Sequence, residues 1–226
     1  MNTTLADRAS ADALIEWRLG TIAQQIPGAT AVLRRHKLDF CCGGDATLTD
    51  AARARGEDAA TIAGELRALA PSHAEVSEAP EPLIEHILER YHETHRRELP
   101  ELILMARRVE EVHAGHAELP EGLSLLLAQI AEAIEEHMQK EERILFPMIR
   151  AGMGRMAVGP ISVMRHEHVE HGERLRQLEE LTRDHTPPAD ACNTWRALYA
   201  GTRKLVDDVM QHIHLENNVL FPQFAP

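Results

Sequence analysis

Histidine and glutamate recur at a matched spacing in the second half of the chain. Residues 137–147 read HMQKEERILFP, and residues 212–222 read HIHLENNVLFP. In both segments a glutamate follows the histidine by four residues, and an aliphatic-Leu-Phe-Pro run comes after it. Imidazole and carboxylate groups bind transition metals, and side chains four residues apart share one face of a helix. The repeat therefore predicts two helices that present the same pair of metal ligands.

Apolar residues at steps of three and four predict that these pairs face the protein interior. The two apolar stripes consist of Leu127, Ile130, Ile134, Ile144, Leu145 and Met148, and of Leu198, Leu205, Val209, Val219 and Leu220. The first stripe includes His137 and Glu141, and the second includes His212 and Glu216. Either pair alone could be a His–Glu hydrogen bond in the core or a pair turned to water. Because an unpaired buried charge costs several kcal/mol and the motif occurs twice, metal binding is the favoured interpretation.

Two further helical segments supply inward-facing histidines, and the pattern does not choose between two candidates in each. The candidates are His92 or His95, and His168 or His171. The resulting set of four histidines and two glutamates contains no thiolate, so it suits non-haem iron or manganese better than structural zinc. Six protein ligands cannot saturate two six-coordinate ions, which leaves positions for an oxo or hydroxo bridge and for small ligands such as O2 or NO.

The elements that must position these residues are helices. Aromatic residues are only 4% of the chain, and the strong helix formers Ala, Leu, Glu and Arg are abundant. Glycine and proline breaks predict four long helices near 82–117, 121–150, 160–184 and 190–221, and Pro100 is expected to kink or split the first. The sequence thus predicts an all-α fold, with an up-down-up-down four-helix bundle preceded by a small helical domain. The expected domains are 1–72 and 82–226, with a proline-rich linker at 73–81.

Two adjacent cysteines, Cys41 and Cys42, lie in the segment DFCCGG. Neighbouring cysteines are poorly placed for a relaxed mutual disulfide. They are either two small buried residues before a turn or a thiol pair that binds metal, carries sulfur or changes its redox state. Cys192 is expected to pack in the core, and the remaining histidines, which include His73, His185 and His214, are expected at the surface.

Composition excludes several classes of function. The formal net charge is −12 and no Lys/Arg run is present, which argues against nucleic acid and anionic membranes as partners. No apolar stretch approaches the roughly 18 residues of a membrane span, and the first residues do not have a signal-peptide pattern. Three cysteines do not make a disulfide framework, so a cytoplasmic protein is expected.

Several motifs together resemble a known family. They are DFCCGG, RYH at 90–92, PELIL at 100–104, HMQKEERILFPMI at 137–149, GPISVM at 159–164 and HIHLENNVLFP at 212–222. They resemble the iron–sulfur cluster repair di-iron proteins, which join a small N-terminal domain to a haemerythrin-like bundle. The resemblance implies two non-haem irons, with Glu141 and Glu216 as bridging carboxylates and four histidines as terminal ligands: His92, His137, His168 and His212. The last pair here is H-x3-E, whereas oxygen-carrying haemerythrin has H-x4-D, which argues against O2 transport.

The resemblance also implies a function. The protein is expected to restore iron–sulfur clusters damaged by nitric oxide or oxidants, by supplying iron, with Cys41 and Cys42 receiving or passing on the metal. Its expected partners are damaged iron–sulfur proteins and the small ligands NO or O2, and a homodimer is a further expectation. One alternative is a di-iron enzyme that reduces NO to N2O. A sensor of O2 or NO ranks lower, because the sequence has no kinase, cyclase or DNA-binding signature.

Overall fold

The computed structural model describes residues 14–26, 28–69 and 79–224. Across these ranges the regular elements are helices, and no strand is present. The only extended pairing there is an isolated bridge between Arg18 and Thr47. The predicted all-α class is confirmed. No helix in the described part of the chain has the length and apolar character required for a membrane span.

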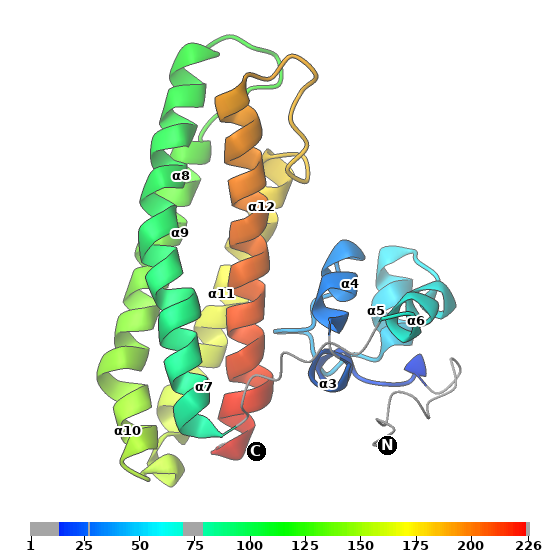
Figure 1. Ribbon diagram of the computed structural model, residues 1–226, viewed down its shortest axis with the longest axis vertical. Helices are drawn as coiled ribbons and strands as arrows, with labels where there is room; N and C mark the ends of the chain where they lie inside the picture. Colours follow the sequence, from blue (N-terminus) through cyan, green and yellow to red (C-terminus); the bar gives the residue numbers. More distant parts are fainter. Residues whose placement is uncertain (1–13, 27, 70–78, 225–226) are drawn as a thin grey trace. The chain divides into compact units, whose positions relative to one another are not determined.

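Four long helices lie side by side and alternate in direction along the chain (Figure 1). They are α8 (Glu93–Val112), α9 (Leu123–Lys140), α11 (Val158–Leu181) and α12 (Asn193–His214). Shorter elements extend them: α7 (Pro80–Ile87) and η1 (Leu88–His92) before α8, η2 (Glu141–Leu145) and α10 (Phe146–Arg150) after α9, η3 (Gly154–Met156) before α11, and η4 (Leu215–Leu220) and η5 (Phe221–Gln223) after α12. The predicted four-helix bundle is confirmed.

Four short helices are present in the described residues of the N-terminal part, 14–26 and 28–69. They are α3 (Leu19–Gln25), α4 (Ala29–Arg35), α5 (Leu48–Arg55) and α6 (Ala59–Arg67). Two have a side-chain cap at their start: Thr47 Oγ1 accepts a hydrogen bond from the Asp50 N–H, and Asp58 accepts from the N–H groups of Ala60 and Thr61. Such caps satisfy N–H groups that a helix start otherwise leaves unpaired. The fully buried side chains here include Ile22, Leu33, Phe40, Leu48, Ile62 and Leu66.

The chain forms two compact units. Among the described residues, one comprises 14–26 and 28–69 together with Ile213–Phe224, and the other comprises Ala79–His212. The boundary between His212 and Ile213 falls inside α12. Residues 73–78 of the predicted linker lie outside the described residues, and its last two residues belong to α7.

Three widened π turns interrupt the helices of the bundle. In each, a backbone N–H donates to the carbonyl five residues back: Glu93 to Leu88, Phe146 to Glu141, and Phe221 to Glu216. Pro147 and Pro222 come directly after two of these turns, and proline has no N–H with which to continue α-helical bonding. The aliphatic-Leu-Phe-Pro repeat therefore accompanies two π turns, and in each the accepting carbonyl belongs to the glutamate four residues after the histidine. Such turns occur frequently at functional sites.

The π turn at Glu141 changes which residues face inward. Ile144, which the periodicity placed on the buried stripe, is 52% exposed, whereas Leu145, Phe146 and Ile149 are buried. The prediction for Ile144 was wrong because a π turn inserts one residue into the helical repeat. All later residues are then rotated relative to an uninterrupted α-helix.

Pro100 does not split the first long helix. The helix α8 runs from Glu93 to Val112 with Pro100 in its interior. An interior proline removes one backbone hydrogen bond and crowds the preceding turn. The flanking Leu99 and Leu102 are buried, and their packing keeps the segment helical across the proline.

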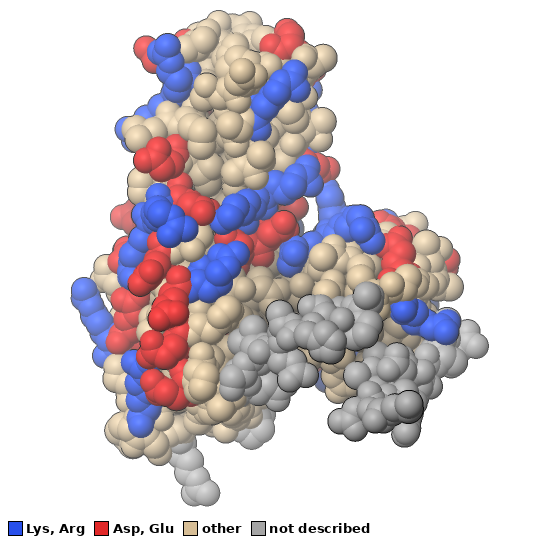
Figure 2. All heavy atoms as spheres, in the orientation of Figure 1, with Lys and Arg blue, Asp and Glu red and all other residues tan. Residues whose placement is uncertain are grey.

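Acidic and basic side chains alternate on the face of the bundle shown in Figure 2. Ion pairs tie neighbouring helices together: Arg90 Nη2 lies 2.7 Å from Asp208 Oδ1, and Lys204 Nζ lies 2.6 Å from Glu98 Oε2. Lys204–Glu98 is exposed to solvent and contributes little, whereas Asp208, the partner of Arg90, is buried. These ion pairs show that many charges of this acidic chain lie beside an opposite charge.

Candidate metal centre

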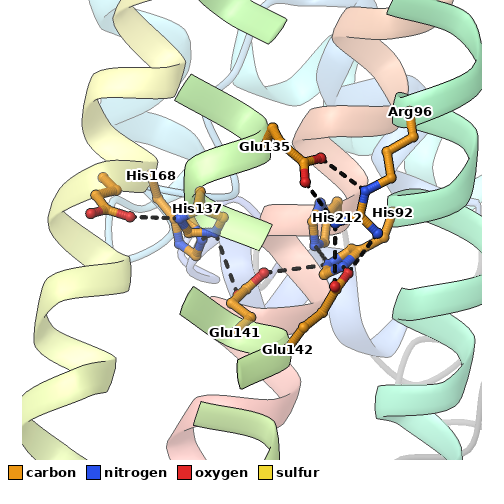
Figure 3. A network of polar contacts seen from close by, with 9 residues as sticks. His92, Arg96, Glu135, His137, Glu141, Glu142, His168 and His212 are labelled. Carbon is orange, nitrogen blue, oxygen red and sulfur yellow. Dashed lines mark hydrogen bonds and ion pairs between the residues drawn. The ribbon is translucent and has the colours of Figure 1, made fainter. Parts of the chain in front are cut away.

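Six side chains meet inside the bundle in two groups of four. The groups are His92, Glu141, His212 and Glu216, and His137, Glu141, His168 and Glu216. In each group the ligand atoms lie within 4.8 Å of one another, and every member is buried. Both groups contain the same two glutamates. Figure 3 shows Glu141 between the histidine pair His137–His168 and the pair His92–His212.

The separations within each group match those of ligands on one metal ion. The Nε2 atoms of His92 and His212 are 3.2 Å apart, and those of His168 and His137 are 3.1 Å apart. Metal–nitrogen bonds are about 2.0–2.1 Å, so neighbouring ligands at ordinary angles lie about 3.0–3.4 Å apart. A metal ion therefore fits each histidine pair.

Glu141 turns one carboxylate oxygen toward each histidine pair. Its Oε2 lies 3.4 Å from His92 Nε2, and its Oε1 lies 3.4 Å from His137 Nε2. The side chain is 0% exposed, and within the described residues neither oxygen has a hydrogen-bond partner. A buried carboxylate in this condition is costly. A cation at each end would satisfy it, so the residues present fit a pair of metal ions.

Carboxylates also contact the outer nitrogens of two histidines. His92 Nδ1 is 2.8 Å from Glu142 Oε1, and His137 Nδ1 is 2.9 Å from Glu167 Oε2. A carboxylate that accepts from Nδ1 fixes the ring and directs the Nε2 lone pair inward, as it does at many metal sites. This contact supports His92 and His137 as ligands.

The two outer carboxylates are themselves held by cations. Arg96 donates to both oxygens of Glu142 and, through Nε, to Glu135, and Lys140 Nζ contacts Glu167. The hydrogen bond from His137, together with that from Lys140, lowers the pKa of Glu167 to about 2, although partial burial opposes the shift. Glu167 is therefore a carboxylate at neutral pH. Helical periodicity did not identify Glu142 or Glu167, because each lies beside the buried stripe. The only signal in the sequence was that each is next to a candidate ligand, Glu142 after Glu141 and Glu167 before His168.

His95 and His171, which the periodicity could not separate from His92 and His168, are buried but belong to neither group. Their rings pack against ligand candidates, with centroids 5.6 Å apart for His95 and His212 and 5.0 Å apart for His171 and His137. Burial lowers the pKa of His171 to about 3. Both are neutral rings that line the centre.

Two histidines expected at the surface are buried. His185 Nδ1 lies 2.9 Å from Thr202 Oγ1, and His214 packs edge-on against Phe40. These expectations were wrong because each ring has a polar or aromatic partner that the sequence pattern does not show. His73 lies outside the described residues.

All three cysteines are free. Cys41 is buried and Cys42 is half-buried, and together with Asp39 they make a third group with metal-ligand geometry. Cys192, expected in the core, is half-buried, and its Sγ lies 3.2 Å from His113 Nε2.

Comparison with known proteins adds to this geometry. A family model described as Hemerythrin HHE cation binding domain matches residues 83–224, and one described as Domain of Unknown function (DUF542) matches residues 15–70. A relative in Musicola paradisiaca, named iron-sulfur cluster repair protein YtfE, is 53% identical over 212 residues, which are 92% of this chain and 96% of that protein. The chain belongs to this family of repair proteins. Relatives of the same name in Cronobacter sakazakii and Escherichia coli O17:K52:H18 are 52% and 50% identical over 208 residues, which cover 91% of this chain and 94% of each. The match confirms the family resemblance seen in the motifs, and the HHE match supports cation binding by the bundle.

Proposed function

We propose that this protein repairs damaged iron–sulfur clusters by supplying iron from a di-iron centre in its helical bundle. The observation that carries the proposal is the pair of buried ligand groups that share Glu141 and Glu216. Relatives that match more than nine-tenths of the chain carry the name of iron–sulfur cluster repair proteins.

In this proposal one iron is bound by His92 and His212, and the other by His137 and His168. Glu141 and Glu216 bridge the two ions, and the remaining positions take an oxo or hydroxo bridge or a small ligand such as NO or O2. Nitrogen and oxygen donors of this kind suit non-haem iron.

The donor set explains how iron can leave. Imidazole and carboxylate groups hold iron less tightly than the thiolates of a cluster-binding protein, whose soft ligands favour iron–sulfur clusters. Transfer from the bundle to a damaged cluster is therefore favourable. Glu142 and Glu167 determine how firmly the ion is held, because they fix the rings of His92 and His137.

The remaining parts of the proposal concern partners and location. The clients are iron–sulfur proteins whose clusters have been damaged by nitric oxide or oxidants, and Cys41 and Cys42 receive iron or pass it on. A homodimer stays a prediction. We place the protein in the cytoplasm, where its three free thiols would stay reduced.

Isotope transfer tests the proposal. The protein is loaded with iron-57 and mixed, in the presence of an external chelator, inorganic sulfide and a thiol reductant, with a client whose [4Fe–4S] cluster has been degraded by NO. Iron-57 is expected in the rebuilt cluster, together with recovered client activity. The variant Glu141→Gln should fail, and Glu170→Gln, which changes an exposed carboxylate on α11, should act like the parent.

A different result would identify another activity. If the client recovers only while NO is being removed, and no iron-57 reaches it, iron supply is refuted and reduction of NO becomes the better explanation. The three relatives are named for cluster repair and not for nitric oxide reduction or sensing.

A further inference from the structure

The thiol pair in the N-terminal part has the geometry of a metal site of its own. Cys41 Sγ lies 3.9 Å from Cys42 Sγ and 3.2 Å from Asp39 Oδ1. One ligand atom from each of the three residues lies within 4.8 Å of the other two. The bundle groups contain only nitrogen and oxygen donors, so a site with two thiolates would select different ions.

The local backbone explains why these atoms converge. Asp39 Oδ1 accepts a hydrogen bond of 2.9 Å from the Cys42 N–H, which folds the carboxylate over the cysteines. A Cβ on Gly43 would lie 2.8 Å from the Asp39 carbonyl oxygen, and one on Gly44 would lie 2.8 Å from the Phe40 carbonyl oxygen. Only glycine fits such close backbone approaches. The two glycines therefore permit the tight turn that brings the sulfurs to the carboxylate.

Hydrogen bonds from η4 fix the backbone of this turn. Asn217 Nδ2 donates to the Cys41 carbonyl oxygen at 3.0 Å, and Asn218 Nδ2 donates to the Phe40 carbonyl oxygen at 3.2 Å. Both amides bind main-chain oxygens and leave the thiols uninvolved. The ligand atoms are thus presented on a supported loop, which lowers the entropy cost of ordering them around an ion.

The distances agree with coordination around one ion. Two thiolates at about 2.3 Å from a tetrahedral metal lie about 3.8 Å apart, and a thiolate and a carboxylate oxygen lie about 3.5 Å apart. The observed 3.9 Å and 3.2 Å differ from these values by a few tenths of an ångström. A disulfide would need the sulfurs at about 2.05 Å, so the pair is spread for an intervening ion instead.

We propose that Asp39, Cys41 and Cys42 form a second metal site, which binds one thiophilic divalent cation of the zinc(II) or iron(II) class. Three protein ligands leave the fourth position of a tetrahedral ion for water or an exchanging ligand, and Cys42 is half-buried. This inference does not depend on the proposed di-iron centre.

Binding at this site releases two protons. Each S–H bond is broken and each sulfur forms a bond to the cation, so that two thiols and one divalent ion give a dithiolate complex and two H⁺ in solution. The affinity for the cation should therefore rise as pH increases.

Cobalt(II) is the probe that separates this site from the bundle. Thiolate ligands give cobalt a sulfur-to-metal charge-transfer band in the near ultraviolet, which histidine and carboxylate ligands do not. The reduced full-length protein, titrated with cobalt(II), should develop this band to the intensity of one thiolate-bound cobalt per chain, whatever cobalt the bundle also takes. Cys41→Ser and Cys42→Ser should each weaken the band and the double variant should abolish it, whereas the matched control Cys192→Ser should retain it in full. His137→Ala, which alters only the bundle, should retain it too.

A further variant tests the carboxylate. Asp39→Asn keeps an acceptor for the Cys42 N–H but removes the charge, and the affinity for cobalt should fall about tenfold or more. Helicity measured by circular dichroism must match the parent for each variant that is compared. The proposal is overturned if the reduced parent shows no thiolate band, or if the band survives in the double cysteine variant. An unchanged affinity in Asp39→Asn would remove the carboxylate and overturn the three-ligand assignment.

Discussion

Replacing Glu167 by glutamine tests whether the outer carboxylate controls the metal centre. Glutamine keeps the shape and an oxygen acceptor for His137 Nδ1, but it removes the negative charge that also pairs with Lys140. Glu170 lies on the same helix, is 48% exposed and pairs with Arg174 at 3.7 Å. Glu170→Gln is thus a matched control that changes the same chemical group away from the ligands.

The effect on the metal-free protein follows from the pKa of Glu167. The value falls from 4.5 to about 2 on folding, and one pKa unit corresponds to about 1.4 kcal/mol. The charged form therefore stabilises the fold by about 3 kcal/mol at most, an upper limit because the side chain is 18% exposed and solvent screens the pair. Since the folded-state pKa is lowered, this stabilisation is complete above about pH 4.5 and is lost as the pH falls toward 2.

Glu167→Gln should weaken metal binding because the Glu167 carboxylate orients the ring of His137. Loss of an outer carboxylate typically weakens a metal site by about 10–100-fold, which is about 1.4–2.8 kcal/mol. We expect Glu167→Gln to lose iron to a chelator about 10–100 times more readily than the parent at pH 7. Glu170→Gln should not differ from the parent.

Two measurements check these values. Urea unfolding of the metal-free proteins at pH 7 and pH 3 should show that the variant is less stable at pH 7 and loses less stability on acidification. Chelator competition, followed by iron absorbance, gives the affinity. If Glu167→Gln holds iron as tightly as the parent, the carboxylate does not act through His137, and this account of the outer contacts is refuted.

Three further predictions follow from the fold and the site. Glu141→Gln should lose both metals together rather than one, because Glu141 belongs to both ligand groups. If metal analysis after gel filtration finds one ion retained, Glu141 is not a ligand shared by the two ions. Phe146→Ala should lower the free energy of unfolding by about 3–5 kcal/mol, because the ring is buried and stacks on His92; denaturant titration measures this, and a change under 1 kcal/mol would argue against the packing. Gly44→Ala should destabilise the N-terminal unit by about 1–3 kcal/mol, since its Cβ would lie 2.8 Å from a carbonyl oxygen. A Cβ on Gly64 would have nothing within 4 Å, so Gly64→Ala should be neutral or stabilising by up to about 1 kcal/mol. Thermal melts should give Gly44→Ala a lower melting temperature than Gly64→Ala.

The repeated motif shows what local sequence can predict. Helical spacing placed His137, Glu141, His212 and Glu216 on inward faces, and all four are buried. Periodicity sufficed here because a residue's face on a helix depends only on its position along the helix. The same reasoning predicted the four long helices and the breaks between them.

The widened turns show where the periodic argument failed. The sequence predicted Ile144 inside and a kink or a split at Pro100; Ile144 is exposed, and α8 is not split at Pro100. Periodicity assumes a constant 3.6 residues per turn, which the π turn at Glu141 violates. The aliphatic-Leu-Phe-Pro repeat was visible, but its meaning depends on backbone hydrogen bonds that the letters do not state.

The sequence by itself determined the helices, their inward faces and the types of ligand, because these depend on residues close together in the chain. Helical periodicity left His92 or His95 and His168 or His171 open, and the family resemblance implied His92 and His168. The tertiary structure places those two in the ligand groups, and only it brought Glu142 and Glu167 behind the rings. Residues three apart on a helix face the same side, so their selection depends on how far apart the helices pack and how each is rotated. Those quantities are set by the whole core and not by any one segment.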